Sequence, residues 1–510
     1  AEDRARLVDE IHRELCAKSY KPLPVRKTYV PKPGKAEKRG LGIPTIKDRV
    51  VQEMLRAILE PIYEAKFYKH SYGFRPFRST HHAALRCKHL IGRWGYTHAV
   101  EGDIRACFDR IQHLKLLKIL RKTIKDERII RLIRDMLKAG CMDDGAWHVT
   151  DEGVPQGGIV SPLLANVYLN ELDWFVASKW ETVGKVEKQR RTRHGTALNC
   201  YIVRFADDFV ALVRGTREQA EQLKAEITKF LDTELHLELS EEKTLVTEVE
   251  RGIDFLGFHI RKYPRATLIT PSRKAMNKFR EKVKERVREA FCLDDVAAIV
   301  HVNRYLVGWG MYYRQVSSAR AFKNADHYVW MRVWKTSRRQ RNLRLTPAQH
   351  YKAHFIRYRF DIRKKNRWRR GGHYGAWANA AHSEAYIIVN IKFIPIRYTL
   401  FHPQLNPYVP EEREILEKRV GTLQPPPDQL PGPMVDSEYG IEWGTLRQTV
   451  LDKAGQRCYL CNKPIKGRTA HVHHRKKRSR FQRRKQANLL ENLIALCPSC
   501  HRRAERENSE

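Results

Sequence analysis

The fold is decided by the stretch Tyr201-Ile202-Val203-Arg204-Phe205-Ala206-Asp207-Asp208-Phe209-Val210-Ala211-Leu212-Val213, an apolar run that two adjacent acids interrupt. Strand-forming residues dominate both arms, so the stretch predicts a β-hairpin with Asp207 and Asp208 at its turn. Adjacent carboxylates repel one another, and a bound divalent cation would offset that repulsion. Mg²⁺ with nucleotide phosphates is the usual occupant of such a site. A solvated Asp-Asp turn is the alternative that the stretch alone leaves open.

A further acid lies upstream, in the segment His98-Ala99-Val100-Glu101-Gly102-Asp103. The segment predicts a short strand that ends at Asp103, followed by a turn into a helix. A strand-end aspartate can meet a hairpin-turn aspartate of an adjacent strand, so Asp103, Asp207 and Asp208 are expected to form a cluster for two Mg²⁺ ions. One ion would lower the pKa of an attacking 3′-hydroxyl, and the other would stabilise a pyrophosphate leaving group.

Several motifs follow one another in the order of a reverse-transcriptase palm. They are Asp103 with Phe108 five residues on, Gly153-Val154-Pro155-Gln156-Gly157-Gly158, and Phe205-Ala206-Asp207-Asp208. The chain resembles a reverse transcriptase in this respect. One position departs from the family, which usually has Tyr where Phe205 stands. Phe keeps the ring and loses the hydroxyl, so we expect polymerisation to survive without any hydrogen bond from that hydroxyl.

The resemblance extends to the group II intron-encoded proteins. Residues 39–52 and Tyr72-Gly73-Phe74-Arg75-Pro76 resemble the first two fingers blocks of that family. Residues 237–244 and 255–258 resemble its sixth and seventh blocks, and residues 302–313 resemble its maturase region, also called X or thumb. A reverse transcriptase of another lineage would usually lack the block near Trp309.

The charge of the chain predicts its partners. The 510 residues are enough for several domains, and 97 Lys and Arg against 58 Asp and Glu give a formal charge of +39. A polyanion bound largely through counterion release explains that excess. An anionic membrane is the rival, but no apolar run of about eighteen residues exists, so we expect no membrane partner. No secretory signal is visible, and a start at Ala1 rather than Met suggests that a short native N-terminal segment precedes it.

Four cysteines form two Cys-x-x-Cys pairs near the end of the chain: Cys458 with Cys461, and Cys497 with Cys500. Four thiolates at this spacing predict a closed tetrahedral Zn²⁺ site. So small a module is expected to need the metal in order to fold.

Between and after these pairs lie His471-Val472-His473-His474, Asn492 and His501, a pattern that resembles an HNH nuclease. The resemblance implies that His474 is the general base, that His473 and His501 hold one Mg²⁺ or Mn²⁺ ion, and that Asn492 orients the loop. Neutral imidazole suits both roles near pH 7. The alternative is a zinc-stapled DNA-binding module that does not cleave.

The palm resemblance also implies residues that bind the incoming nucleotide. Phe108 would be an aromatic gate that excludes a 2′-hydroxyl, and Gln156 would lie near the nucleotide, as would Ile104. Arg75 is a candidate for the triphosphate, since a guanidinium fork matches phosphate, although it would equally match an acid in the fingers. Lys243 lies where related polymerases carry a lysine able to protonate pyrophosphate, or it is a surface lysine.

Residues 363–370 are strongly basic and lie upstream of a stiff, Pro-rich linker. We expect phosphate contacts from this run, with Trp368 as a stacking platform, although a solvated charge run is the plain alternative. The residues are Arg363, Lys364, Lys365, Arg367, Trp368, Arg369 and Arg370.

The expected fold is a multidomain α+β chain with right-hand polymerase fingers and palm, an α-helical thumb (maturase), a basic DNA-binding region and a small zinc-stapled ββα-metal HNH domain. The expected divisions are 1–96 (N-terminal extension and fingers, including an exposed basic loop over 25–39), 97–270 (palm with part of the fingers), 271–360 (thumb), 361–424 (basic region), 425–439 (linker) and 440–510 (HNH).

The resemblance implies an RNA-directed DNA polymerase that is also a maturase for group II intron splicing and that nicks target DNA to prime reverse transcription. Its partners would be group II intron RNA in a ribonucleoprotein, target double-stranded DNA and dNTPs, in the cytoplasm of a bacterial or organellar host. One alternative is an RNA-binding splicing factor whose polymerase is inactive. The other is a reverse transcriptase of another lineage.

Overall fold

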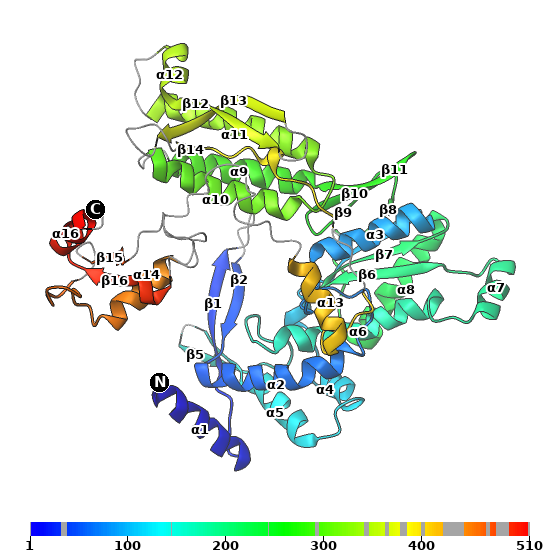
Figure 1. The fold of residues 1–510 in the computed structure, drawn as a ribbon. Coiled ribbons are helices and arrows are strands. Elements are labelled where there is room, and N and C mark those ends of the chain that lie inside the picture. The colour runs from blue at the N-terminus through cyan, green and yellow to red at the C-terminus, as the bar shows by residue number, and fades with distance from the viewer. Residues whose placement is uncertain are drawn as a thin grey trace. The chain divides into compact units, whose positions relative to one another are not determined.

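In the computed structural model, a β-hairpin lies at one edge of a four-stranded sheet (Figure 1). The paired aspartates lie at the turn of this hairpin. Strand β6 (Cys200–Phe205) pairs antiparallel with β7 (Asp208–Val213). Strand β7 pairs with β3 (His98–Asp103), and β3 pairs with β8 (Leu245–Glu248). The predicted hairpin and the predicted strand ending at Asp103 are both confirmed.

The structure describes most of the chain, which divides into two units. The described residues are 2–31, 38–143, 145–242, 244–290, 295–340, 346–362, 367–377, 385–398, 403–421, 443–465, 470–475 and 489–507. The first unit comprises Ala1–Lys282, Trp309–Asp326 and Ile394–Pro426, and the second comprises Val283–Gly308, His327–Phe393 and Pro427–Glu510. None of the helices in these described ranges has the length and apolar character needed to cross a membrane.

Helices pack on both faces of the four-stranded sheet (Figure 1). Alternate strand residues such as Ile202, Phe209 and Ala211 share one large core with helices α6 (Ser161–Trp180) and α8 (Arg217–Leu235). The intervening residues point to the opposite face, where α3 (Thr80–Trp94) packs. Both faces are therefore covered, which fixes the register of the strands that carry the acids.

A second sheet in the first unit corrects one expectation. The basic segment over 25–39 was expected to be an exposed loop, but β1 (Val25–Pro31) and β2 (Lys38–Ile43) form an antiparallel pair. Thr28 and Tyr29 favour strands, and their pairing with Leu41 and Gly40 outweighs the charge of the segment. The sheet order is β2-β1-β4-β5, with β4 (Cys141–Asp143) and β5 (Ala146–His148).

The remaining elements of residues 1–290 are mostly helices. They are α1 (Glu2–Cys16), α2 (Ile46–Glu64), η1 (Cys107–Asp109), α4 (His113–Arg121), α5 (Glu127–Lys138), α7 (Lys185–Arg193), the sheet strands β9 (Ile253–Phe255), β10 (Phe258–Tyr263) and β11 (Ala266–Pro271), and α9 (Arg273–Ala290).

Helices also dominate the next part of the chain, before short strands return. The elements are α10 (Asp295–Tyr313), α11 (Ala319–Gln340), α12 (Pro347–His354), β12 (Phe355–Ile362), β13 (Arg367–Trp377), β14 (Ala385–Ile387), η2 (Ile391–Phe393), α13 (Pro410–Gly421), α14 (Trp443–Lys453), β15 (His471–His474), η6 (Leu490–Asn492), β16 (Leu493–Leu496) and α16 (Pro498–Glu507).

A buried ion pair holds the aspartate turn against the core. Arg204, on β6, donates from Nε and Nη2 to the two carboxylate oxygens of Asp173 on α6, at 2.8 and 2.6 Å. Its Nη1 donates to Asn166 Oδ1 at 3.0 Å and to the carbonyl oxygen of Ala206 at 2.8 Å. The side chains of Arg204 and Asp173 are both 0% exposed. The guanidinium therefore links the core helix directly to the turn that carries Asp207.

We expect Arg204→Met to lower the free energy of unfolding by about 3–5 kcal/mol, because it leaves the carboxylate of Asp173 buried and unpaired. The double variant Arg204→Met, Asp173→Leu should lose less than the single variant, because it removes both charges. Urea and thermal denaturation measure both.

The control is Arg121→Met, which breaks an exposed ion pair with Glu127 and should cost at most about 1 kcal/mol. Equal losses for the single and double variants would contradict the assigned role of the ion pair.

Candidate functional site

Three aspartates lie at one end of the four-stranded sheet. Asp103, the last residue of β3, is directly opposite Asp208, the first residue of β7. Asp207 precedes Asp208 in the turn, after Ala206, whose φ of 57° lies in the left-handed region. The carboxylates do not form a tight ligand group in the described part of the structure, and their role as metal ligands stays a prediction.

The aspartate turn is supported by the segment that precedes Phe74. The amide of Tyr72 donates to the carbonyl oxygen of Arg204 at 2.8 Å, so the segment runs beside β6. A Cβ on Gly73 would lie 2.2 Å from the backbone nitrogen of Ala206, which no side chain could accommodate. A glycine is therefore required where this segment meets the turn.

The predicted gate, Phe108, is a half-buried residue of η1. Its ring meets that of Phe74 edge to face, with centroids 6.2 Å apart and planes at 90°. Ile104 is 2% exposed, and its backbone bridges to Leu239. The contact with Phe74 holds the Phe108 ring in place, and its role as a gate stays a prediction.

Gln156 lies on the loop after Gly153, next to η1. Its Nε2 donates to both carboxylate oxygens of Asp109, at 3.2 and 3.3 Å. Its backbone carbonyl oxygen accepts from the amide of Gly42 at 2.8 Å, so β2 contacts the same loop. Asp109, which Gln156 contacts, directly follows the predicted gate Phe108 in η1.

The structure decides between the two interpretations of Arg75. Its guanidinium is buried and donates to both oxygens of the Glu64 carboxylate, at 2.8 and 2.6 Å, and to the carbonyl oxygens of Tyr68 and Ser71. The proposal that Arg75 binds a triphosphate is therefore corrected, because its fork is already saturated within the protein. Lys243 lies outside the described residues.

The thiol of Cys107 is buried, and the charge of Asp207 acts on it. Burial, and then the negative charge of Asp207, raise the pKa of Cys107 to about 12. The thiol is consequently neutral near pH 7.

The basic run is partly described. Arg363, Lys364 and Lys365 lie outside the described residues, whereas Arg367, Trp368, Arg369 and Arg370 belong to β13. Strand β13 pairs antiparallel with β12, with Ile362 opposite Arg367. The described residues of the run, from Arg367 to Arg370, are therefore part of a β-hairpin, and the contact of the run with nucleic acid stays a prediction.

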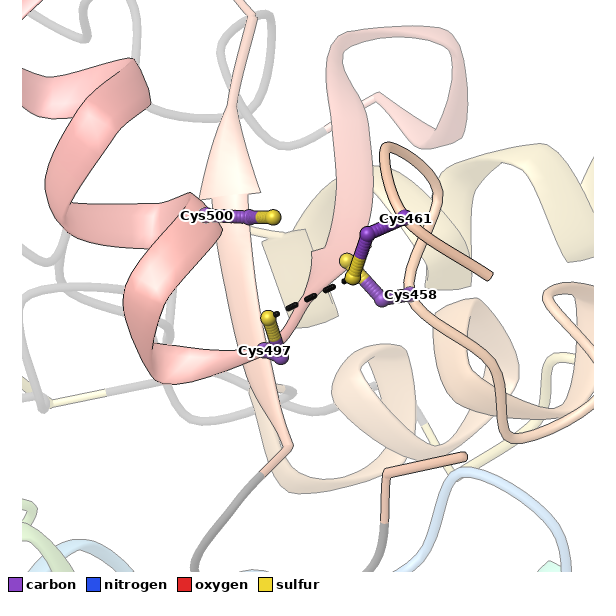
Figure 2. Close-up of side chains that lie close together, drawn as sticks. All are labelled: Cys458, Cys461, Cys497 and Cys500. Carbon is purple, nitrogen blue, oxygen red and sulfur yellow. Dashed lines mark hydrogen bonds between the residues drawn. The ribbon is translucent and has the colours of Figure 1, made fainter. Parts of the chain in front are cut away.

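The four cysteines form one compact cluster (Figure 2). Their sulfur atoms lie within 4.8 Å of one another, and Cys461 Sγ is 3.7 Å from Cys497 Sγ. Cys458 and Cys461 lie in the turn after α14, while Cys497 and Cys500 lie at the end of β16 and the start of α16. Four sulfurs from two separate turns, all directed toward one centre, fit a tetrahedral Zn²⁺ ion.

Two of these thiols have pKa values that are shifted in opposite directions. The hydroxyl of Ser499 lies 3.2 Å from Cys497 Sγ and, by hydrogen bonding, lowers the pKa of that thiol to about 6. Hydrogen bonds to Cys497 and Cys461 raise the pKa of Cys500 to about 12. A bound cation would stabilise all four as thiolates, so metal affinity should fall as the pH falls.

Two of the predicted nuclease histidines lie side by side. The rings of His473 on β15 and His501 on α16 have centroids 5.1 Å apart at 88°. His474 follows on β15, and strand alternation directs it to the opposite face from His473. Asn492 is 8% exposed, and its backbone carbonyl oxygen accepts a hydrogen bond from the backbone amide of Arg475 at 2.8 Å.

Sequence analysis assigned no role to His471, which also belongs to this group. Its ring centroid is 5.0 Å from that of His501. Its position two residues before His473 on a strand is the signal that could have placed it on the same face.

Family comparisons agree with the order of these sites. The model described as "Reverse transcriptase (RNA-dependent DNA polymerase)" matches residues 30–260, "Group II intron, maturase-specific domain" matches 276–355, and "HNH endonuclease" matches 458–507.

Two curated relatives each match about half of the chain. Group II intron-encoded protein LtrA of Lactococcus lactis subsp. cremoris is 38% identical over 300 residues, and the match covers 50% of this chain and 49% of that protein. Protein YkfC of Escherichia coli (strain K12) is 38% identical over 282 residues, and the match covers 50% of this chain and 72% of that protein. The chain belongs to the group II intron-encoded proteins. The resemblance drawn from the motifs is thereby confirmed.

This group II intron-encoded protein is a multidomain α+β chain with a reverse-transcriptase domain. It spans about half the length of LtrA. Among solved structures, apo telomerase from Candida Tropicalis is 12% identical with a TM-score of 0.39, over 65% of this chain and 61% of that chain.

We expect the purified intron-encoded protein to carry one zinc ion per chain, lost on Cys497→Ser, because the cysteine cluster offers four converging sulfurs. Elemental analysis measures the zinc, and hydrogen exchange over residues 458–507 should rise when a chelator removes it. Cys16→Ser is the control, since Cys16 is an exposed thiol of α1. Equal zinc in the Cys497 and Cys16 variants would contradict the site.

Proposed function

We propose that the chain is an RNA-directed DNA polymerase that also assists group II intron splicing and nicks its DNA target. The observation that carries the proposal is the pairing of Asp103 with Asp208 at adjacent strand ends, with Asp207 in the turn between β6 and β7, inside a matched reverse-transcriptase domain. Acids held at this point of a rigid sheet are suited to polymerase chemistry.

The proposed division follows the motifs: fingers over 1–96, palm over 97–270, an α-helical thumb over 271–360, a basic DNA-binding region over 361–424, a linker over 425–439 and a ββα-metal HNH domain over 440–510. The order β15, β16, α16 in the last domain supports the ββα assignment. The maturase match over 276–355 supports the thumb assignment.

In the palm, Asp103, Asp207 and Asp208 would hold two Mg²⁺ ions. When bound, Mg²⁺ lowers the pKa of a primer 3′-hydroxyl and neutralises charge on the leaving pyrophosphate. The role of the protein is to hold the three carboxylates in place, which the ion pair of Arg204 and the close approach of Gly73 both favour.

Around the carboxylates, the chain selects and orients the nucleotide. Phe108, braced by Phe74, would exclude a 2′-hydroxyl from the site. Gln156 and Ile104 would line the nucleotide site, and Lys243 would protonate the pyrophosphate.

The nucleic-acid partners would be structured intron RNA and double-stranded target DNA. The formal charge of +39 supports binding to both through phosphates. The basic hairpin that contains Arg367–Trp377 is the proposed DNA contact, and Trp368 is its proposed stacking residue.

The HNH module would nick one DNA strand and so generate the primer. His474 would take a proton from the attacking water, while His473 and His501 would hold a Mg²⁺ or Mn²⁺ ion at the scissile phosphate. The 5.1 Å approach of the His473 and His501 rings supports that pairing, and Asn492 would orient the loop that leads from β15.

Primer extension tests the palm assignment. On an RNA template with a DNA primer, dNTPs and Mg²⁺, we expect Asp207→Ala, Asp208→Ala to lose extension by more than about 100-fold, while RNA-assisted splicing persists. Asp232→Ala, which removes an exposed acid of α8, is the control. Extension by the double variant would refute the palm assignment, and no extension by the unaltered protein would favour the splicing factor with an inactive polymerase.

Strand nicking tests the nuclease assignment separately. His474→Ala should slow nicking of double-stranded target DNA by about 10²- to 10⁴-fold, the usual contribution of a general base. Extension from an annealed primer should be unchanged. His12→Ala, which alters an exposed histidine of α1, serves as the control. Unaltered nicking by the His474 variant would contradict the assignment of His474 as the general base, whereas no nicking by the unaltered protein would favour the DNA-binding alternative for this module.

A further inference from the structure

The loop that carries Gln156 is tied to the segment that carries the predicted gate. The amide of Val154 donates to the carbonyl oxygen of Phe108 at 2.7 Å, and the amide of Gly153 donates to that of Ile111 at 2.8 Å. His113 Nε2 donates to the carbonyl oxygen of Gly153 at 2.7 Å. These three bonds make the two segments one rigid unit.

Gly153 shows how closely the segments approach. Its φ is +86°, and a Cβ there would lie 2.8 Å from the backbone carbonyl oxygen of Asp109. Any side chain at this position would force the loop away from η1. The approach brings the side chains of Asp109 and Gln156 within hydrogen-bond distance.

The chemistry of this side-chain pair fixes the orientation of the amide. An ionised carboxylate can only accept, so Gln156 must present its NH₂ group to Asp109, as the distances of 3.2 and 3.3 Å show. The carbonyl oxygen Oε1 is then directed away from Asp109 and is left as an acceptor. Without Asp109, the amide could rotate by a half turn and present a donor instead.

We propose that Asp109 is a positioning residue, which fixes the Gln156 amide so that its carbonyl oxygen accepts a hydrogen bond from the incoming nucleotide. This inference rests on the proposed polymerase function and deepens it. Asp109 does not contact the nucleotide in this proposal, because it acts through Gln156. Its carboxylate lies in the same three-residue element as Phe108, so the gate and the amide are set by one element.

A double-mutant cycle on the full chain tests the proposal. Single-nucleotide extension is measured for the unaltered protein, Asp109→Ala, Gln156→Ala and the double variant, with KM for the dNTP separated from kcat. We expect Asp109→Ala to raise KM about tenfold with kcat little changed, as for the loss of one charge-assisted hydrogen bond. In the Gln156→Ala background the same change should alter KM by no more than about twofold.

Two further variants separate orientation from charge and from general loss of packing. Asp109→Asn removes the charge but keeps an oxygen that can accept from Gln156, so it should retain most of the affinity for dNTP. Glu152→Ala breaks the neighbouring bond between Gln112 and Glu152 and should leave both constants unchanged.

Full additivity in the cycle, or equal defects in Asp109→Asn and Asp109→Ala, would overturn the proposal. The first result would show that Asp109 acts independently of Gln156, and the second that its charge is what matters. Failure of the unaltered protein to extend any primer would instead refute the proposed function, and this inference with it.

Discussion

The aspartate turn depends on the buried ion pair between Arg204 and Asp173. A buried guanidinium is costly unless its charge is paired and its donors are satisfied. Here the carboxylate of Asp173 takes two donors, and Asn166 and the Ala206 carbonyl take a third. One of these acceptors is the Ala206 carbonyl oxygen, which belongs to the backbone of the turn itself. The hydrogen bond to it therefore fixes the position of Asp207 relative to α6.

Local sequence patterns predict the hairpin and the strand that ends at Asp103. They do not predict contacts between segments that are distant in the sequence. Strand-forming residues on both sides of Asp207 and Asp208 predict the hairpin, and the structure covers both faces of its sheet with helices. Arg75 shows the limit. A guanidinium fork fits a phosphate and a carboxylate equally well, and only the fold brings Glu64 to it.

The pairing of β1 with β2 was not predictable from the sequence for a similar reason. A dense run of positive charge suggested exposure and therefore a loop, but a hairpin can be exposed and regular together. Its register, with Arg26 opposite Ile43, is set by partners that no local pattern identifies. The prediction of a loop backbone for this basic segment was therefore wrong.

The two candidate sites obtain rigidity in different ways. The aspartates are held by a large core of strands and helices, while the C-terminal module has a small core in which Cys458 and Cys497 are themselves buried members. A cation bound to these sulfurs would therefore be part of that core, and its loss would loosen the packing of Val472 and Leu493. Since these residues belong to β15 and β16, the strand that carries His473 and His474 would lose its support as well. The cysteine cluster and the histidines are separate in chemistry, but they are coupled through one small core.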